Sequence, residues 1–316
     1  MQVNKTPATR AGILSILRAS PVPVSGESMA QALGKTRVAV WKAIQSLNAA
    51  GYGIVAGNDG YTLLRDIQDS LEAWEFDANA GPMFHFSITD STMEHARDQA
   101  LAGAEVGTVV TADSQRSGRG TDGKNWASPS GGLFFTLITR PSLNLAYNHL
   151  PVLAAQCALA RTSARLTRNP LLPVWPNDLF ILSPEDRGKA GGILPEILSS
   201  GSEIRFENLG IGINTRSKPD EPNASAIDVS RHALLAAFLS EFTDEVFSPR
   251  EVMAEWNALC PEVGKPIEYC RKGRAETLHG TFLGVDARGW ANIADAKETE
   301  AFPPGSIITI RKGMNQ

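Results

Sequence analysis

The stretch Gln115 to Trp126 reads Gln-Arg-Ser-Gly-Arg-Gly-Thr-Asp-Gly-Lys-Asn-Trp. Apolar segments at 106–112 and 133–139 flank it, and both predict strands. Three glycines within six residues allow the backbone to approach a ligand closely. Arg119 and Lys124 add cationic hydrogen-bond donors that suit a phosphate or a carboxylate. The stretch therefore predicts a ligand-covering loop between two strands.

Two other interpretations fit part of the same stretch. A Gly-x-Gly-x-x-Gly spacing begins at Gly118, as in the dinucleotide-binding fingerprint, but that fingerprint requires a helix to begin at its third glycine. Pro129 and a glycine pair follow instead, which disfavours a Rossmann site. A solvated glycine-rich hairpin loop without a ligand also fits, because short motifs match by chance.

The composition is that of a globular protein with more than one domain. The chain has 316 residues, of which 42% are hydrophobic and 20% are charged, enough for about two or three domains. No apolar run is long enough to span a bilayer, and a signal peptide's apolar core is lacking. We therefore expect a cytoplasmic protein with no membrane partner. The scattered cysteines, Cys157, Cys260 and Cys270, predict buried thiols rather than disulfides or a metal site.

The first 64 residues differ in charge from the rest of the chain. They hold six lysine or arginine residues and two acidic ones, a net charge of +4, whereas residues 65–316 carry −8. A basic head on an acidic body predicts that the head meets a polyanion.

Three helices and a hairpin are predicted within this head. Helices are expected at 8–19, 26–33 and 37–50, with Ser25 and Thr36 as N-caps, and strands at 52–55 and 61–64 flank a Gly-Asn-Asp-Gly turn. This order describes a winged helix-turn-helix whose third helix lies in the DNA major groove. A three-helix protein-interaction module with incidental charge is the alternative.

The third helix is expected to present a small, polar and basic face to DNA. That face comprises Arg37, Ala39, Lys42, Ala43, Gln45 and Ser46. Lys35, Thr36 and Arg37 are placed to hold backbone phosphates where the helix begins. The predicted DNA-binding residues are Thr36, Arg37, Lys42 and Gln45.

The remaining chain predicts an α+β body. Residues 65–82 are weakly patterned and acidic, which is typical of a linker, and a mixed α/β domain is expected at 83–260. A helix at 148–165 is apolar on nearly all sides and is expected to be buried. Short strands with intervening turns at 261–316 predict a small β-barrel of the SH3 type.

Polar residues at three points of this body suggest a site. Asp178 lies among apolar residues, and a buried carboxylate needs a cation or a metal as partner. Lys189 beside three glycines can approach an anionic ligand as a point charge; a solvent-exposed hairpin lysine is the alternative. The strand Leu209 to Asn214 has two glycines, where another group is expected to press close.

Four segments together resemble the biotin protein ligases. They are Ser117 to Trp126, Trp175 to Asp178, Lys189 to Leu194 and Gly210 to Asn214, in the family's order and approximate spacing. With its winged helix, the chain resembles the bifunctional type, a ligase that is also the biotin operon repressor. The resemblance implies a class II synthetase-like catalytic domain between the winged helix-turn-helix and an SH3-like barrel.

The resemblance also implies the reaction and its partners. Biotin and ATP, with Mg²⁺, would give biotinyl-5′-AMP and pyrophosphate, and the acyl group would then pass to a lysine of a biotin carboxyl carrier protein. Biotinyl-AMP would order the loop and favour a homodimer that binds operator DNA, a population shift driven by one ligand.

By the same resemblance, Lys189 and Arg119 are catalytic. The implied biotin-binding residues are Ser91, Thr92, Gln115, Arg119, Gly120, Thr121 and Lys189. The implied nucleotide-binding residues are Lys124, Trp126, Asn177, Asp178 and Asn214. No metal-ligating residue is assigned.

The chain departs from the family's pattern at four positions. The family usually has arginine where Thr121 and Asp122 stand, lysine in place of Val174 and asparagine in place of Met93. Three of these changes remove positive charge, and a lost charge-assisted hydrogen bond costs about 1.5–3 kcal/mol when buried. A biotin-sensing transcription factor with decayed ligase activity is therefore one alternative, and a lipoate-type acyl ligase is another.

Overall fold

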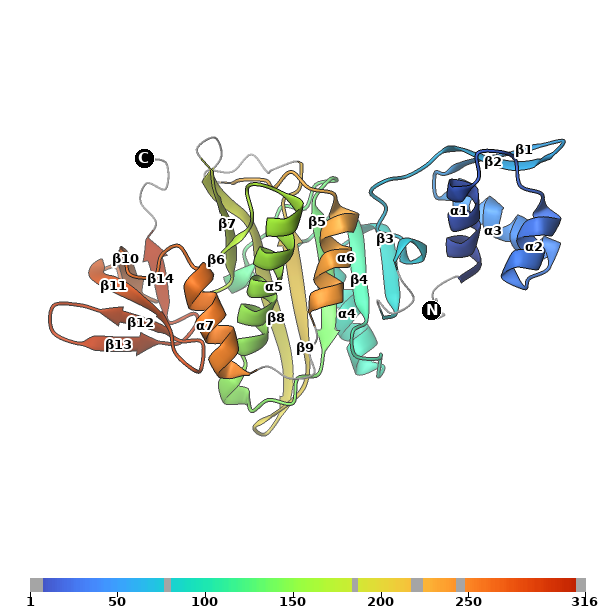
Figure 1. The fold of residues 1–316 in the computed structure, drawn as a ribbon. Coiled ribbons are helices and arrows are strands. Elements are labelled where there is room, and N and C mark those ends of the chain that lie inside the picture. Colours follow the sequence, from blue (N-terminus) through green and yellow to red (C-terminus); the bar gives the residue numbers. More distant parts are fainter. Residues whose placement is uncertain (1–7, 77–80, 184–186, 217–223, 243–247, 311–316) are drawn as a thin grey trace. The chain divides into compact units, whose positions relative to one another are not determined.

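The computed structural model describes residues 8–76, 81–183, 187–216, 224–242 and 248–310. It divides into two compact units, Met1–His85 and Phe86–Gln316, and Figure 1 shows the elements of each. Within the described ranges, no helix has both the length and the apolar character needed to cross a membrane.

The first unit contains the predicted three helices and hairpin. They are α1 (Ala8–Ala19), α2 (Gly26–Leu33), α3 (Arg37–Ala49), β1 (Gly53–Gly57) and β2 (Gly60–Arg65). Both predicted N-caps are confirmed: the Ser25 hydroxyl accepts from the Ser28 N–H at 3.0 Å, and the Thr36 hydroxyl accepts from the Ala39 N–H at 3.2 Å. Gly34 ends α2 in the left-handed region (φ 60°), which leaves two residues to turn the chain into α3.

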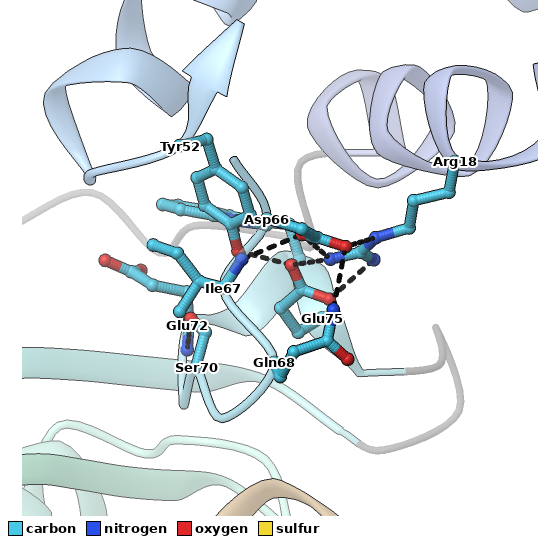
Figure 2. Close-up of polar contacts among 9 residues, drawn as sticks. Arg18, Tyr52, Asp66, Ile67, Gln68, Ser70, Glu72 and Glu75 are labelled. Carbon is cyan, nitrogen blue, oxygen red and sulfur yellow. Dashed lines mark hydrogen bonds and ion pairs between the residues drawn. The ribbon is translucent and has the colours of Figure 1, made fainter. Parts of the chain in front are cut away.

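An ion-pair network ties the chain after the hairpin to α1 (Figure 2). Arg18 donates to Asp66 at 2.7 and 2.8 Å and to Glu75 at 2.9 Å. Trp74, next to Glu75, is buried in the same apolar core as the helices. Part of the segment predicted as a linker thus contacts the head, and the domain boundaries at 64 and 82 stay predictions.

The second unit holds all but the first three residues, Met83–His85, of a seven-stranded sheet in the order β3-β4-β5-β9-β8-β7-β6. Along this order, every pairing of neighbouring strands from β4 through β9, β8 and β7 to β6 is antiparallel. The strands are β3 (Met83–Thr89), β4 (Val109–Gln115), β5 (Leu133–Thr139), β9 (Glu203–Ile213), β8 (Arg187–Ser200), β7 (Asp178–Leu182) and β6 (Leu172–Val174). The mixed α+β class predicted for this body is confirmed.

Helices cover both faces of this sheet. They are α4 (Thr92–Leu101), α5 (Leu150–Leu166) and α6 (Arg231–Glu241), and Figure 1 shows α5 and α6 along one face. Phe238 of α6 packs on Phe135, which lies opposite Ile211 in the ladder. The next position, Gly210, points the other way because side chains alternate along a strand, and there it meets Met93 of α4.

One predicted strand is wrong in its course. Because proline cannot donate to a ladder, Pro176 within the apolar segment Val174 to Ile181 predicts a single strand entered through a bend or a bulge. Instead β6 ends at Val174, a cis Trp175–Pro176 peptide turns the chain, and β7 begins at Asp178 as its antiparallel partner. Pro176 has no N–H to give to a ladder, so it occupies the turn.

The C-terminal segment forms a five-stranded antiparallel sheet beside α7 (Pro249–Leu259), with Trp256 of α7 buried in its core. The order is β13 (Thr299–Phe302), β12 (Ala291–Ala294), β11 (Leu278–Val285), β10 (Pro266–Arg271) and β14 (Ile307–Ile310). Among the described strands the order is open, so closure into an SH3-type barrel stays a prediction. The short β13 was not predicted, because Thr-Glu-Ala-Phe lacks an apolar alternation.

Glu207 of β9 is a buried acid. It is 0% exposed, and within the described part of the chain neither of its carboxylate oxygens has a hydrogen-bond partner. Burial disfavours the charged form and raises the pKa of Glu207 from its usual 4.5 to about 8. The folded protein therefore holds a proton on Glu207 at neutral pH.

Glu207→Gln should remove part of the pH dependence of stability. Between about pH 4.5 and 8 the unfolded chain releases a proton that the folded chain keeps, so Glu207 lowers the free energy of unfolding by roughly 1.4 kcal/mol per pH unit as pH rises. Urea unfolding at several pH values within that window measures this slope, and Glu203→Gln, at an exposed position in the same strand, is the matched control. Equal slopes in the wild type and in Glu207→Gln would contradict the prediction.

Candidate functional site

A pocket in the second unit gathers most of the residues predicted from the sequence. Those that line it are Ser91, Thr92, Gln115, Arg119, Gly120, Thr121, Trp126, Asn177 and Lys189. Apolar and glycine residues complete its lining: Met93, Gly192, Ile193, Leu194, Gly210, Ile211 and Gly212. Segments far apart in the sequence thus meet because β4, β8 and β9 belong to one sheet.

Gln115 is held at the rim by both ends of its amide. Its Oε1 accepts from the Thr92 N–H at 2.9 Å and from the Thr92 hydroxyl at 3.2 Å, and its Nε2 donates to the Ser128 hydroxyl at 2.9 Å. The Thr92 hydroxyl also lies 2.9 Å from that of Thr136. This network orients donors and acceptors of a kind that could recognise a small polar ring. Ser91 is the N-cap of α4 but makes no side-chain capping bond.

The glycine-rich loop folds back on itself. The Trp126 N–H donates to the Gly118 carbonyl at 2.9 Å, and the Gly120 N–H donates to the Lys124 carbonyl at 2.8 Å. A Cβ at Gly118 would lie 2.4 Å from the Trp126 carbonyl oxygen, closer than van der Waals contact permits. Glycine at 118 is therefore required for the fold of the loop.

The two glycines of β9 make room for side chains above the sheet, as predicted. A Cβ at Gly210 would lie 2.5 Å from the Met93 sulfur, and a Cβ at Gly212 would lie 2.5 Å from Trp126 Nε1. That indole nitrogen is buried and has no hydrogen-bond partner among the described residues. Trp126 is thus placed with its polar atom toward the floor of the pocket.

Lys189 reaches the pocket with its charge partly exposed. Its ammonium lies 2.6 Å from the Asp178 carboxylate and 5.2 Å from the centroid of the Trp126 ring. The two side chains of the ion pair are 37% and 15% exposed, respectively. The cation that the mostly buried Asp178 needs is therefore Lys189, which is paired in the structure although its side chain remains partly exposed.

Three predicted nucleotide-binding residues do not line this pocket. Asp178 lies next to it through Lys189, and Lys124 is exposed on the loop. Asn214 is buried, and its amide donates to the Ser225 carbonyl at 3.0 Å. In the described contacts Asn214 therefore holds two backbone segments together.

The loop carries an ion pair that no local pattern predicted. Asp122 stands in the left-handed region (φ 56°) at the tip of the loop, and its carboxylate lies 2.5 Å from the ammonium of Lys272, beyond the end of β10. Hydrogen bonding to Lys272 lowers the pKa of Asp122. The pair joins the loop to the C-terminal sheet across 150 residues of sequence.

The DNA-binding face predicted for α3 needs one correction. Ala43, expected to face outward, is 8% exposed and belongs to the helical core. Lys42 and Gln45 are exposed, while Arg37 is exposed and lies 3.5 Å from Glu27 of α2. Ala43 lies on the same side as the core residues because 100° per residue carries it toward them.

Comparison with known proteins gives two family matches. Residues 9–62 match the model of an HTH domain, and residues 85–214 match the model of the biotin/lipoate A/B protein ligase family. The bifunctional ligase/repressor BirA of Bacillus subtilis (strain 168) is 29% identical over 299 residues, covering 84% of this chain and 87% of the relative. That of Escherichia coli (strain K12) is 25% identical over 290 residues, covering 84% and 86%.

A solved structure shares the fold of the larger part of the chain. The biotin protein ligase from Aquifex aeolicus in complex with biotin and ATP matches with a TM-score of 0.56 and 23% sequence identity. The match covers 72% of this chain and 98% of that chain.

Lys272→Gln should loosen the glycine-rich loop. Without its ammonium the Asp122 carboxylate loses its partner, and we expect tryptic cleavage after Arg119 and Lys124 to rise about two- to fivefold, the modest effect of a surface ion pair. Asp122→Asn should act alike, the double variant should add nothing further, and the difference should shrink at high salt.

Lys265→Gln, at an exposed lysine of the same region, is the control for the loss of one positive charge. Cleavage rates that match those of the wild type in both Lys272→Gln and Asp122→Asn would show that the pair does not restrain the loop.

Proposed function

We propose that this chain, in which a helix-turn-helix domain precedes a domain of the biotin/lipoate A/B protein ligase family, is a biotin protein ligase that also represses transcription. Its homologues over 84% of its length are bifunctional ligase/repressors. The observation that carries the proposal is the convergence of the glycine-rich loop, the Gln115 amide network and the Lys189 ammonium on one pocket.

The first step joins two anions. A carboxylate oxygen of biotin attacks the α-phosphorus of ATP, forming biotinyl-5′-AMP, and pyrophosphate leaves. Their repulsion must be offset by cations and backbone donors fixed in place beforehand. Lys189, which lines the pocket, and Arg119, which borders it in the loop, are the residues we assign to this task. The Lys189 ammonium is paired with the Asp178 carboxylate at 2.6 Å.

Gln115 and Thr92 are the residues we assign to biotin. The ureido ring of biotin presents N–H donors and a carbonyl acceptor, and the pocket rim presents hydroxyl, amide and backbone groups within 3.2 Å of one another. Ser91, Gly120 and Thr121 would complete this subsite. Below it, Met93 and Leu194, which lies opposite Gly210 in the ladder, supply apolar lining for the carbon skeleton.

We assign the nucleotide to the side of the pocket nearest Trp126. An indole ring can stack on a base, and here it lines the pocket with the Lys189 ammonium 5.2 Å from its centroid. Asn177 also lines the pocket, with its amide donating to the Ile193 carbonyl at 2.7 Å. Lys124 and Asp178 would contact the nucleotide from outside the pocket lining. Asn214 would act indirectly, by holding in place the backbone to which it is hydrogen-bonded.

Mg²⁺ would enter with the nucleotide. The described residues contain no group of three or more His, Cys, Asp or Glu side chains that could hold a metal ion. This fits Mg²⁺, which is bound through one or two carboxylates together with substrate phosphates and waters. Asp178 is the carboxylate placed for this, and the ion would neutralise phosphate charge.

In the second step the amine of a carrier lysine attacks the acyl carbon of biotinyl-AMP, and AMP leaves. The carrier must reach the pocket, so the loop must admit its lysine side chain while excluding water. We propose that the acceptor is a biotin carboxyl carrier protein, and that biotinyl-AMP favours a homodimer that binds operator DNA. We also propose that the C-terminal sheet is a barrel of the SH3 type.

Three of the four departures from the family's pattern are accommodated by the fold, which supports a working ligase over a decayed one. The carboxylate that Asp122 adds is paired with Lys272, so its charge is neutralised. Val174 is fully buried in β6 and Met93 packs on Gly210, so both are integrated in the core of the fold. A working ligase is the function we propose.

Lys189→Ala should lower the rate of carrier labelling by about 10²–10³-fold, the cost of removing one group that stabilises the charge of a transition state. The measurement is transfer of labelled biotin to a biotin carboxyl carrier domain in the presence of ATP and Mg²⁺. The same assay with labelled lipoate in place of biotin distinguishes a biotin ligase from the alternative, a lipoate-type acyl ligase.

Two further variants serve as controls for this result. Lys265→Ala should label normally, and Lys189→Ala combined with Asp178→Asn, which leaves no unpaired carboxylate, should be at least as slow as Lys189→Ala. Near-normal labelling by Lys189→Ala would refute its catalytic role, and no labelling by the wild type would refute the ligase itself.

Arg37→Ala combined with Lys42→Ala should weaken DNA binding and leave carrier labelling unchanged. Each lost phosphate contact lowers affinity for all sequences and reduces the slope of log affinity against log salt by about 0.9. Fluorescence anisotropy with a labelled duplex at several salt concentrations measures both. Unchanged affinity would instead favour a protein-interaction module.

A further inference from the structure

The exposed side of α3 carries two large apolar side chains. Val38 and Trp41 have 62% and 51% of their surface exposed. Apolar surface left in water is unfavourable, and an apolar patch bordered by polar residues is typical of an interaction site. Neither residue is among those that the sequence pattern assigned to DNA.

These two residues form one strip with the polar residues of the helix. At 3.6 residues per turn, positions i, i+3, i+4 and i+7 lie on one side. The strip comprises Val38, Trp41, Lys42 and Gln45. The opposite side comprises Val40, Ile44 and Leu47, each no more than 1% exposed. The strip therefore points away from the core of the first unit.

We propose that Val38 and Trp41 read thymine methyl groups in the major groove of the operator. The C5 methyl of thymine is the apolar group that base pairs present in that groove, and apolar side chains contact it. The same strip carries the Lys42 ammonium, suited to phosphate, and the Gln45 amide, suited to a base edge. This charge and hydrogen-bonding pattern favours DNA over an apolar protein partner.

The inference rests on the proposed DNA-binding function and predicts what the recognition helix prefers. Sites bound by the chain should contain thymines at fixed positions in each half-site. Replacing one such thymine by uracil removes only its methyl group and leaves the hydrogen-bonding pattern intact. Loss of one buried methyl should weaken binding by about 3- to 10-fold.

The test uses the full chain with biotin and ATP. A duplex is selected from a random-sequence pool by the wild type, and each thymine is then replaced by uracil in turn. We expect the wild type to lose affinity at one or more thymines, and Trp41→Ala or Val38→Ala to bind the unmodified duplex more weakly and to lose that sensitivity to uracil.

Two control variants separate this role from others. Val22→Ala removes an equally exposed valine (62%) between α1 and α2 and should change neither affinity nor uracil sensitivity. Lys42→Ala should weaken binding but keep the sensitivity to uracil, since it removes a charge and not a methyl contact.

Two results would overturn the inference. Wild-type binding that is insensitive to uracil at every position, or uracil sensitivity that survives in both Trp41→Ala and Val38→Ala, would show that these side chains read no methyl group, while DNA binding itself would stand. Failure of the wild type to select any duplex would overturn the DNA-binding function together with the inference.

Discussion

The pocket depends on the absence of side chains at two positions of β9. A methyl group at Gly212 would collide with the Trp126 indole, and one at Gly210 would collide with the Met93 thioether. Because these positions are bare, the loop and α4 can approach the sheet from one face, while the other face stays packed against α5 and α6. A close backbone approach of this kind is a steric requirement, and it positions the loop, the lysine and the amide network that together form the site.

Electrostatics then determine how the charges of the pocket are balanced. The Lys189 ammonium is close to the Asp178 carboxylate and to the face of the Trp126 ring, and both groups stabilise its charge. An anionic substrate bound as we propose would compete with Asp178 for this cation. The same principle holds at the loop tip, where Lys272 neutralises Asp122 and links the loop to a sheet much later in the chain.

Several features of the fold and of the site could be predicted because they depend on neighbours in sequence. Ser25 and Thr36 cap helices through atoms three residues away. The hairpin after α3 follows from its turn residues, and the pocket residues Arg119 and Lys189 were identified beside glycines. Ala43 was misplaced because an alanine fits either side of a helix, so its side depends on the packing of the whole head.

By itself, the sequence determined the order of domains, the class of the fold and the chemical types of the site residues, since caps, turns and hydrophobic periodicity are local properties of the chain. Only the tertiary structure decided which charges meet. The pairs Asp178–Lys189, Asp122–Lys272 and Arg18–Glu75 join residues 11, 150 and 57 positions apart. The exposure of Trp41 on α3 was also decided there. These outcomes depend on which surfaces the packed core brings together. A local sequence pattern contains no information about contacts between residues that are far apart in the chain.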